Sequence, residues 1–513
     1  MGNASTAVDG GERVEYTSDV FGATYLGHQG WLVESGESKI LVDPILGDGL
    51  HFVDDDCVRI YPPRRFDFAA FPAVDGVIVS HEHPDHLNLP SLLRLDRSIP
   101  IYLSARASCA AFSILEELGF RVTLLHSGAT VRIGDLEIHP FHTVEITRDE
   151  WDVVPLLIRD RAGHGSLATS VDAPESDAFG RFTKEHHGRP ALWVSSHNHM
   201  DLFAVREGGK QERAEATIQR LADEFVRRVK RTFSRDEAPE VIALLETGFS
   251  FARDLEWMNA HVFPGRMEKV APLVGNQLPD WTLRSPLPGH TFEFVDHRLV
   301  NERPNTSFLD VRERNLWPAR GSEAFRGPVP DYEPISGREE FEGSDLDTLM
   351  AELNRFAEYL YGRELHRVLY TSGSGGGDMP YPRVGMSLRT SSAPIIVEYR
   401  PERCAFELVS GVDARKTFAI GMECWANDLL GVLRLDIPSG YLMLGRYRKW
   451  SGLDVRAELD AELVLYTHPL RQPWGTLRAY RDLAARLQHG GPRVEAQIDM
   501  LNRRRVQQPQ GAG

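Results

Sequence analysis

The residues with the clearest chemical meaning are three histidines and an aspartate packed into six positions: His81, His83, Asp85 and His86. They follow the short β-branched run at residues 77–80, so the pattern His-x-His-x-Asp-His lies at the tip of a predicted strand. Residues two apart on a strand point the same way, which lets His81 and His83 face one ion. Asp85 and His86 come after the chain turns, and they can address a second ion beside the first.

This mixture of imidazole and carboxylate groups predicts two bound metal ions. Histidine and aspartate together suit zinc, iron or manganese. Two such ions held about 3.5–4 Å apart can share a ligand and act together on a substrate. We therefore expect a dinuclear metalloenzyme that acts on a small-molecule substrate.

The overall composition narrows the class of protein. The chain has 513 residues, which favours two or more domains. Its formal charge of −16 argues against a nucleic-acid partner, because phosphate binding needs a basic surface. The four cysteines form no C-x-x-C pair, and no segment reads as a signal peptide or a membrane span. We therefore expect a cytoplasmic protein with reduced thiols.

The order of predicted elements indicates an α/β fold. Hairpins come first, then strands alternate with helices, which predicts an αββα sandwich of two face-to-face sheets over residues 19–299. Residues 24–33 read as one strand of this sandwich. A linker or arm at 300–343 and a C-terminal α+β accessory domain at 344–507 follow, with a strand-like run around Leu369. Disordered ends are expected at 1–18 and 508–513.

The motif resembles that of the metallo-β-lactamase superfamily. The resemblance covers roughly residues 20–297 and rests on Leu41-Val-Asp43-Pro44, on the run from Ser80 to His86, and on a strand-turn-strand that ends at Asp172. It implies the αββα fold and a dinuclear centre. It also implies that Asp172 is a metal ligand, and that Asp43 and His28 lie behind the ligands and orient them.

Two further ligands are implied by the same resemblance. The family has a third ligand, usually histidine, shortly before the strand predicted at 154–158. Glu150 holds that position here, and His142 and Glu145 are the alternatives. The last family ligand is a histidine further on, for which His199 is preferred over His197.

A glutamate in the third position affects which metal is expected. Extra carboxylate favours iron over zinc, and the di-iron oxygenase branch of the superfamily, which includes the β-hydroxylase of chloramphenicol biosynthesis, is similar in this respect. The leading hypothesis is therefore a di-iron monooxygenase supplied by an external electron donor. The alternatives are a dizinc hydrolase of an ester, lactone or phosphodiester, and a non-catalytic binding or scaffold protein.

The C-terminal region carries a weaker resemblance. The segment from Phe418 to Val432, followed by Gly445-Arg-Tyr-Arg, resembles a sterol-carrier-type lipid-binding module. The alternative, which we favour, is an ordinary α+β accessory or homodimerisation domain.

Overall fold

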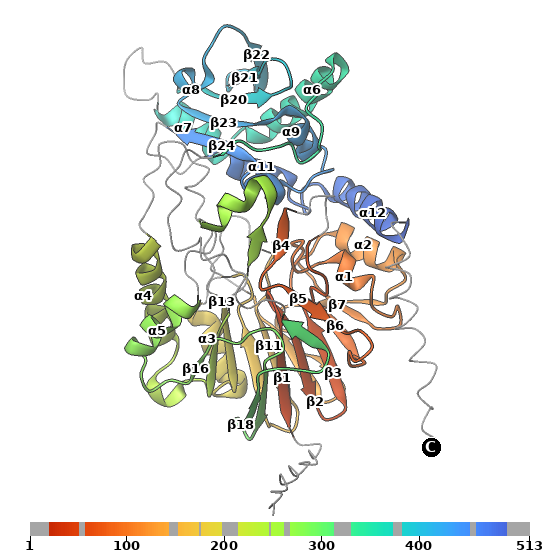
Figure 1. Cartoon of the computed structure of the whole chain (residues 1–513), viewed down its shortest axis with the longest axis vertical. Helices are drawn as coiled ribbons and strands as arrows, with labels where there is room; N and C mark the ends of the chain where they lie inside the picture. The colour runs from red at the N-terminus through yellow and green to blue at the C-terminus, as the bar shows by residue number, and fades with distance from the viewer. Residues whose placement is uncertain are drawn as a thin grey trace, which may run out of the picture.

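The described residues form two packed sheets, a set of helices outside them, and a third sheet at the C-terminal end. The structure is a computed structural model, and it describes residues 20–50, 57–142, 152–173, 176–196, 214–245, 248–260, 267–311, 330–372, 382–451 and 458–489. The predicted disordered ends, 1–18 and 508–513, lie outside these ranges. Figure 1 shows the sandwich in the lower half and the C-terminal sheet above it.

The first sheet holds the metal-type motif. Its eight strands run in the order β18-β17-β1-β2-β3-β6-β7-β8. β3, β6, β7 and β8 are parallel, and the remaining neighbours are antiparallel. The strands are β1 (Phe21–Gly27), β2 (Gly30–Ser35), β3 (Ser38–Val42), β6 (Gly76–Val79), β7 (Ile101–Ser104), β8 (Val122–Leu125), β17 (Thr291–Val295) and β18 (Arg298–Arg303).

The second sheet has seven strands in the order β16-β14-β13-β12-β11-β10-β9. The layer between the two sheets is filled by apolar side chains from both of them, such as Val33 and Ile78 on the first sheet and Ile138 and Val194 on the second. Leu41 and Leu103, also on the first sheet, belong to a different apolar core. The strands are β9 (Val131–Ile133), β10 (Leu136–Pro140), β11 (Leu156–Asp160), β12 (Ser166–Thr169), β13 (Leu192–Ser196), β14 (Val241–Leu245) and β16 (Leu283–Arg284).

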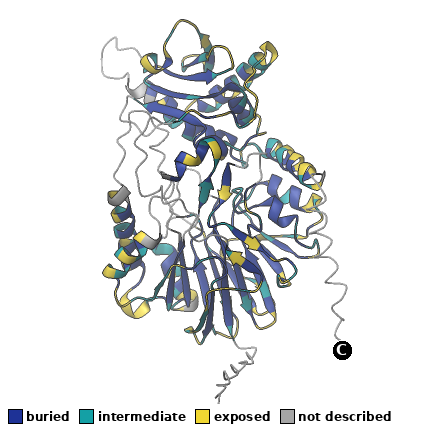
Figure 2. Ribbon diagram, viewed as in Figure 1, coloured by how far each residue is buried: buried dark blue, intermediate teal, exposed yellow. Residues whose placement is uncertain are grey.

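Helices cover the outer face of each sheet. Phe179, Phe225 and Val274 pack against the second sheet from α3, α4 and α5. Leu92 and Leu115 pack against the first sheet from α1 and α2. The bounds are α1 (Leu89–Leu92), α2 (Cys109–Glu117), α3 (Asp177–His187), α4 (Ala214–Thr232) and α5 (Met267–Gln277). The predicted αββα sandwich is therefore confirmed, and Figure 2 shows its strands largely buried.

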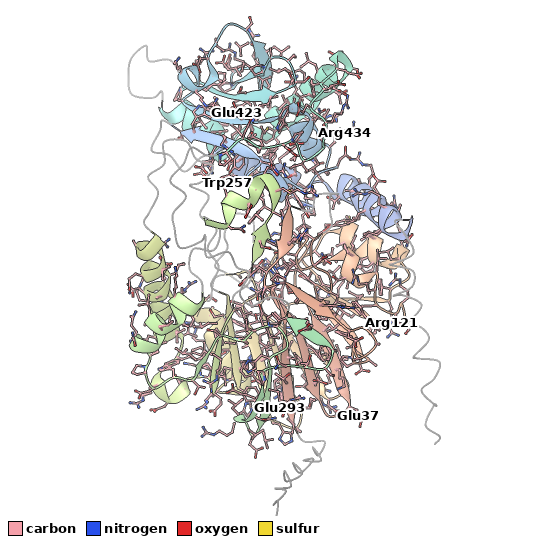
Figure 3. All side chains as sticks on the ribbon, viewed as in Figure 1. Glu37, Arg121, Trp257, Glu293, Glu423 and Arg434 are labelled. Carbon is pink, nitrogen blue, oxygen red and sulfur yellow. The ribbon has the colours of Figure 1, made fainter. Side chains whose placement is uncertain are left out.

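Short elements join the sandwich to the C-terminal part. Two two-stranded sheets pair β4 with β15 and β5 with β19. Figure 3 shows Trp257, on η3, just below the C-terminal sheet, where the Arg448 guanidinium lies 5.6 Å from its ring centroid. These elements are β4 (Val58–Ile60), β5 (Arg64–Phe66), η2 (Arg235–Glu237), β15 (Phe249–Phe251), η3 (Arg253–Ala260) and β19 (Leu309–Val311).

The C-terminal part is the predicted α+β unit. Its five-stranded sheet has the order β22-β21-β20-β23-β24, with β20 and β23 parallel. The strands are β20 (Val384–Arg389), β21 (Ile395–Arg400), β22 (Ala405–Val409), β23 (Ile420–Trp425) and β24 (Tyr447–Ser451). The helices are α6 (Gly343–Leu360), α7 (Glu364–Ser372), α8 (Ala414–Thr417), α9 (Ala426–Leu433), α10 (Ser439–Met443), α11 (Leu459–Thr467) and α12 (Pro473–His489).

This unit packs directly on the motif-bearing half of the sandwich. Leu477 and Leu483 of α12 belong to the same apolar core as Leu89 and Leu92 of α1. Tyr480 donates a hydrogen bond to the Oε1 atom of Glu82 over 3.0 Å. Figure 1 shows α12 beside α2 and α1. The C-terminal unit therefore covers the region next to the motif.

Two predictions about individual elements were wrong. Residues 24–33 are two strands, because Gly27 and His28 both adopt positive φ (99° and 55°) and reverse the chain before β2. Leu369 lies in helix α7, where its fully buried side chain packs into the core on one helix face. In addition, β18 crosses the predicted boundary at residue 299, since the sheet continues to Arg303.

Candidate metal centre

Strand β6 and the turn after it hold the motif rigidly. β6 is buried throughout and pairs with β3 on one side and β7 on the other. The backbone N–H groups of His86 and Leu87 both donate to the carbonyl of His83, which closes a tight turn. Asn88 then caps α1 by accepting a hydrogen bond from the Ser91 N–H. The motif is thus fixed between a central strand and a capped helix.

Asp43, at the end of β3, anchors two residues of the motif. Its Oδ1 atom accepts from the Ser80 N–H at 2.8 Å, and its Oδ2 atom accepts from the Ser80 hydroxyl at 2.6 Å. Oδ2 also lies 2.9 Å from Nδ1 of His86. A carboxylate at Nδ1 places the proton there and leaves Nε2 of His86 free to bind a cation. This is the geometry that the orienting role predicted for Asp43 requires.

Among the described residues, two sets of side chains bring their ligand atoms within 4.8 Å of one another. The first set is His81, His86 and Asp172, and the second is His28, Asp85 and His86. His86 belongs to both. Because Nδ1 of His86 faces Asp43, only its Nε2 atom is available, and that atom can bind one ion. The two sets therefore lie side by side and overlap at His86.

In the first set, Nε2 of His86 lies 3.0 Å and Nε2 of His81 3.6 Å from Oδ2 of Asp172. Asp172 follows β12 after Val171, whose φ of 55° turns the chain toward the motif. Both histidines have no exposed surface, and Asp172 is partly buried. The structure therefore brings Asp172 next to His81 and His86.

In the second set, Nε2 of His28 lies 2.8 Å from Oδ2 of Asp85, and Nε2 of His86 lies 3.9 Å from the same oxygen. His28 occupies the turn between β1 and β2, and the Tyr25 hydroxyl donates to its carbonyl at 2.8 Å. The sequence placed His28 behind the ligands. The structure places its imidazole in a ligand set.

His83 is the motif residue that stands apart from these two sets. Its ring lies edge-on to His81, with 4.4 Å between the ring centroids, and its side chain is partly exposed. It lines a pocket that also reaches Asp85. His83 therefore lies between the buried cluster and the space that a substrate can enter.

The sequence analysis missed Asp152. This carboxylate has no exposed surface, and neither of its oxygens has a hydrogen-bond partner within the described part of the chain. Nε2 of His468, from the C-terminal unit, lies 4.0 Å from its Oδ1 atom. Asp152 comes four residues before β11, in the same short stretch as Glu150, so its position was the available signal.

The electrostatics of the cluster match a cation site. Burial lowers the pKa of His81, and the neighbouring His86 and His83 lower it further, which keeps this imidazole neutral and able to bind metal. Burial opposes protonation of His86, but Asp172, Asp43 and Asp85 outweigh it and raise its pKa well above the usual value. Burial likewise opposes ionisation of Asp172, but His86 and His81 hold its pKa well below the usual value.

Unpartnered polar atoms provide a test of whether the residues suit a metal. Nε2 of His81, Nδ1 of His28 and both oxygens of Asp152 are buried without a hydrogen-bond partner in the ranges that the structure describes. A buried carboxylate or imidazole left in this state is costly unless a cation or another polar group completes it. The donor set is a mixture of imidazole and carboxylate, which suits zinc, iron or manganese. The residues present therefore fit the expected ions.

Most of the remaining predicted ligands lie outside the described residues. Glu150 and His199 lie outside the described residues, as do their alternatives Glu145 and His197. His142 is described and exposed, after the end of β10, and it belongs to neither ligand set.

A pocket of about 780 Å³ begins at the cluster and extends under the C-terminal unit. Glu82, His83 and Asp85 line it at the cluster end. Residues of α10, α11 and α12 line the rest, including Tyr441, Val464 and Leu483. The active-site space is therefore formed jointly by the sandwich and the C-terminal unit.

Comparisons with known proteins identify a family model that matches part of the chain. Residues 23–153 match the model of the beta-lactamase superfamily domain. The resemblance to the metallo-β-lactamase superfamily is thereby confirmed for this part of the chain.

Two curated relatives match over short segments. An uncharacterized protein of Mycobacterium tuberculosis is 36% identical over 75 residues, which are 14% of this chain and 19% of that protein. The N-acyl-phosphatidylethanolamine-hydrolyzing phospholipase D 1 of Caenorhabditis elegans is 32% identical over 78 residues, which are 15% of this chain and 22% of that protein. The chain thus spans about a fifth of the length of each relative.

Solved structures with similar folds cover about half of the chain. An isothiocyanate hydrolase from Delia radicum gut bacteria has a TM-score of 0.37 at 14% identity, over 53% of this chain and 99% of that chain. CmlA, a diiron β-hydroxylase from Streptomyces venezuelae, has a TM-score of 0.34 at 20% identity, over 54% of each chain. Within the described residues, none of the helices is long and apolar enough to cross a membrane.

Proposed function

We propose that this chain is a dinuclear metal-dependent hydrolase that cleaves an ester or phosphodiester bond at the cluster end of the pocket. One observation carries the proposal: two sets of histidine and aspartate side chains share His86 and lie beside a pocket that His83 and Asp85 line. The match of residues 23–153 to the beta-lactamase superfamily domain supports it.

The residues divide into those that would hold the ions and those that would position them. His81, His86 and Asp172 would hold one ion, and His28 and Asp85 would hold the other, with Asp152 available to complete the set. Asp43 orients His86 and Ser80 from behind. Divalent ions bound here would supply Lewis acidity to the scissile bond.

Other side chains at the pocket have roles that do not depend on the ions. His83 faces the pocket, where it can orient a substrate or exchange a proton with it. His468 accepts a hydrogen bond at Nδ1 from the Leu470 N–H, so its proton sits on Nε2, on the side of Asp152. The distance of 4.0 Å between this Nε2 atom and Oδ1 of Asp152 is too long for a hydrogen bond.

The relatives support hydrolysis over the other chemistry. The phospholipase D from C. elegans is by name an enzyme that hydrolyses N-acyl-phosphatidylethanolamine, and it is 32% identical to this chain over 78 residues. The hydrolase was the alternative in the sequence analysis. It is the first proposal because the two ligand sets found among the described residues consist of histidine and aspartate.

A di-iron oxygenase is the second candidate, favoured by Asp152. This buried carboxylate adds to Asp85 and Asp172 and makes the site richer in negative charge, which favours iron in a higher oxidation state. This candidate requires dioxygen and an external electron donor, whereas the hydrolase requires neither. A non-catalytic scaffold is the weakest of the three, since nothing in a scaffold calls for buried, unpartnered ligand atoms.

The decisive experiment measures metal content and reaction on the same purified protein. Two zinc or manganese ions per chain, with metal-dependent hydrolysis of bis(p-nitrophenyl) phosphate or p-nitrophenyl acetate, would support the hydrolase. Two irons with a ferric charge-transfer band and dioxygen uptake would overturn it in favour of the oxygenase. A chain that binds no metal would favour the third candidate, the non-catalytic scaffold protein.

A matched pair of variants links the result to the cluster. Asp172→Asn should lower the metal content and the hydrolysis rate together, because it removes a charged ligand of one set. The exposed Asp236→Asn should change neither. Full metal content in Asp172→Asn would remove Asp172 from the proposed site.

A further inference from the structure

The C-terminal unit forms most of the wall of the pocket that leads to the cluster. Of the residues that line it, those from 435 to 486 outnumber those from the sandwich, and they come from the segment before α10 and from α10, β24, α11, α12 and the loops that join them. The sandwich contributes mainly the cluster end, with Leu50, Phe249 and residues 82–85. The pocket is thus a joint structure with a reactive end and a long remaining wall.

Lys449, Glu458 and Asp460 on this wall are engaged with one another. Nζ of Lys449 donates to Oε2 of Glu458 at 2.6 Å and to Oδ2 of Asp460 at 2.8 Å. The Tyr447 hydroxyl also donates to Asp460, at 2.8 Å. The Tyr480 hydroxyl donates to Glu82 across the boundary between the two parts. These groups are satisfied without a ligand, so they do not demand a polar one.

The rest of the wall is largely apolar. Phe249, Ile437, Met443, Leu444, Val464 and Leu483 line the pocket. Ile437, Met443 and Leu444 keep 6–9% of their surface exposed, and Val464 keeps more. Apolar surface of this kind gains about 25 cal/mol for each Å² that a ligand removes from water.

The volume and the charge distribution limit the ligand further. A volume of about 780 Å³ lies in the range of pockets that enclose small organic molecules. Acidic residues among the lining, such as Asp436, Glu458 and Asp482, outnumber the basic ones, Lys449 and Arg486. An extended anionic body would therefore be repelled, and an uncharged one would not.

We infer that the C-terminal unit is the substrate-binding wall of the active site, and that the substrate is an acyl ester or a comparable molecule with an elongated, uncharged hydrocarbon body. The hydrocarbon body lies along α10, α11 and α12, and the cleavable bond lies at His83 and Asp85. The assignment of the cleavable bond rests on the proposed function, but binding of the apolar body does not.

Two alanines allow the wall to be filled without disturbing the cluster. Ala461 on α11 and Ala479 on α12 both line the pocket and are only partly buried. Tryptophan at either position would extend into the space that the hydrocarbon body occupies. Ala485, exposed on α12, provides the matched control with the same substitution outside the lining.

The first measurement is binding of the neutral apolar probe N-phenyl-1-naphthylamine, followed by its fluorescence. The full-length protein and Ala485→Trp should bind it, and Ala461→Trp and Ala479→Trp should bind it at least about tenfold more weakly. Circular dichroism and the metal content identify any variant that has not folded, and the other helix then provides the test. Equal binding by all four proteins would overturn the inference.

The second measurement compares p-nitrophenyl octanoate with p-nitrophenyl acetate on the metal-loaded protein. The two pocket-filling variants should lose about tenfold or more in kcat/KM for octanoate, mainly through KM, and should keep the acetate rate within about twofold. An equal loss for both esters would count against the inference. Hydrolysis of neither ester, with probe binding still sensitive to the tryptophans, would overturn the proposed function and leave the apolar pocket in place.

Discussion

The buried polar groups at the two ends of the pocket differ in whether they have hydrogen-bond partners. At the cluster end, His81, His28 and Asp152 present buried atoms without a partner in the described chain. At the C-terminal wall, Lys449 and Asp460 are almost as deeply buried, yet they are paired with each other. Unpaired buried groups are tolerated where a ligand completes them, and paired ones serve the fold itself. The comparison separates a site for ions from a wall for an apolar body.

The largest effect is expected at the residue that joins both ligand sets. His86→Ala removes the imidazole common to the two sets, so the ion beside His81 and Asp172 should be lost, and metal-dependent turnover with it. His366, a buried histidine of the C-terminal unit that contacts the Tyr399 hydroxyl, provides the control. Metal analysis of both alanine variants tests this, and two ions retained in His86→Ala would contradict the cluster.

Breaking the buried ion pair of the C-terminal wall should lower the stability of the protein and leave its metal content unchanged. Lys449→Met leaves the buried carboxylate of Asp460 without its cation, which should cost about 3 kcal/mol of unfolding free energy. Urea denaturation measures this loss, and metal analysis should still find the full complement. The exposed pair of Lys416 and Asp413 offers a control, because Lys416→Met should leave the midpoint unchanged. A loss of metal in Lys449→Met would contradict the expectation that only the cluster end of the pocket holds the ions.

An intermediate effect, on metal affinity, is expected for Asp43, which contacts His86 from the side away from the ions. Asp43→Asn replaces one acceptor oxygen by an NH₂ group, which accepts no hydrogen bond. A single oxygen then remains for the Ser80 N–H, the Ser80 hydroxyl and Nδ1 of His86. His86 would lose its fixed orientation, and metal affinity should fall about 10- to 100-fold. Titration with a competing chelator measures the change. An unchanged affinity would show that the hydrogen bond to Asp43 does not orient His86.

The smallest effect, on the pH dependence of stability, is expected for Glu82, which lies between the cluster and the C-terminal wall. Burial raises the pKa of Glu82 from 4.5 to about 7, even though hydrogen bonds from Ser108 and Tyr480 oppose the shift. The folded protein therefore binds this proton more tightly than the unfolded chain does. The contribution of Glu82 to stability is therefore fully present below pH 4.5 and is lost as the pH rises through about 7, by at most about 1 kcal/mol per pH unit.

Glu82→Gln removes this titration and isolates its contribution. Chelator-treated protein should be used, so that bound ions do not alter the charge near Glu82. Urea melts from pH 4.5 to 8 should then show a flatter dependence for Glu82→Gln than for the unchanged protein. Parallel curves would mean that Glu82 titrates alike in the folded and unfolded states.

Several features of the site could be predicted because they depend on neighbours in sequence. The motif from His81 to His86 follows a buried strand directly, so its clustering needs only local geometry. Asp43 ends the adjacent parallel strand β3, so its approach to the motif follows from strand pairing. Asp172 lies at a strand end on the facing sheet, where the resemblance implied a ligand.

Other features depend on contacts that no local pattern encodes. The turn at His28 looked like the middle of one strand, and its side chain reaches Asp85, which is 57 positions further along the chain. Asp152 resembled its acidic neighbours in sequence, and only burial singles it out. The pKa of Glu82 depends on Tyr480, which is 398 positions away.

The sequence alone determined the αββα sandwich, the α+β unit and the residue types at the core of the cluster, because hydrophobic periodicity and short-range spacing encode them. The tertiary structure decided that His28 joins the ligand sets, that Asp152 is buried beside the cluster, and that α10, α11 and α12 close the pocket. The physical reason is that packing between distant segments determines which side chains converge, and that packing depends on the whole chain at once.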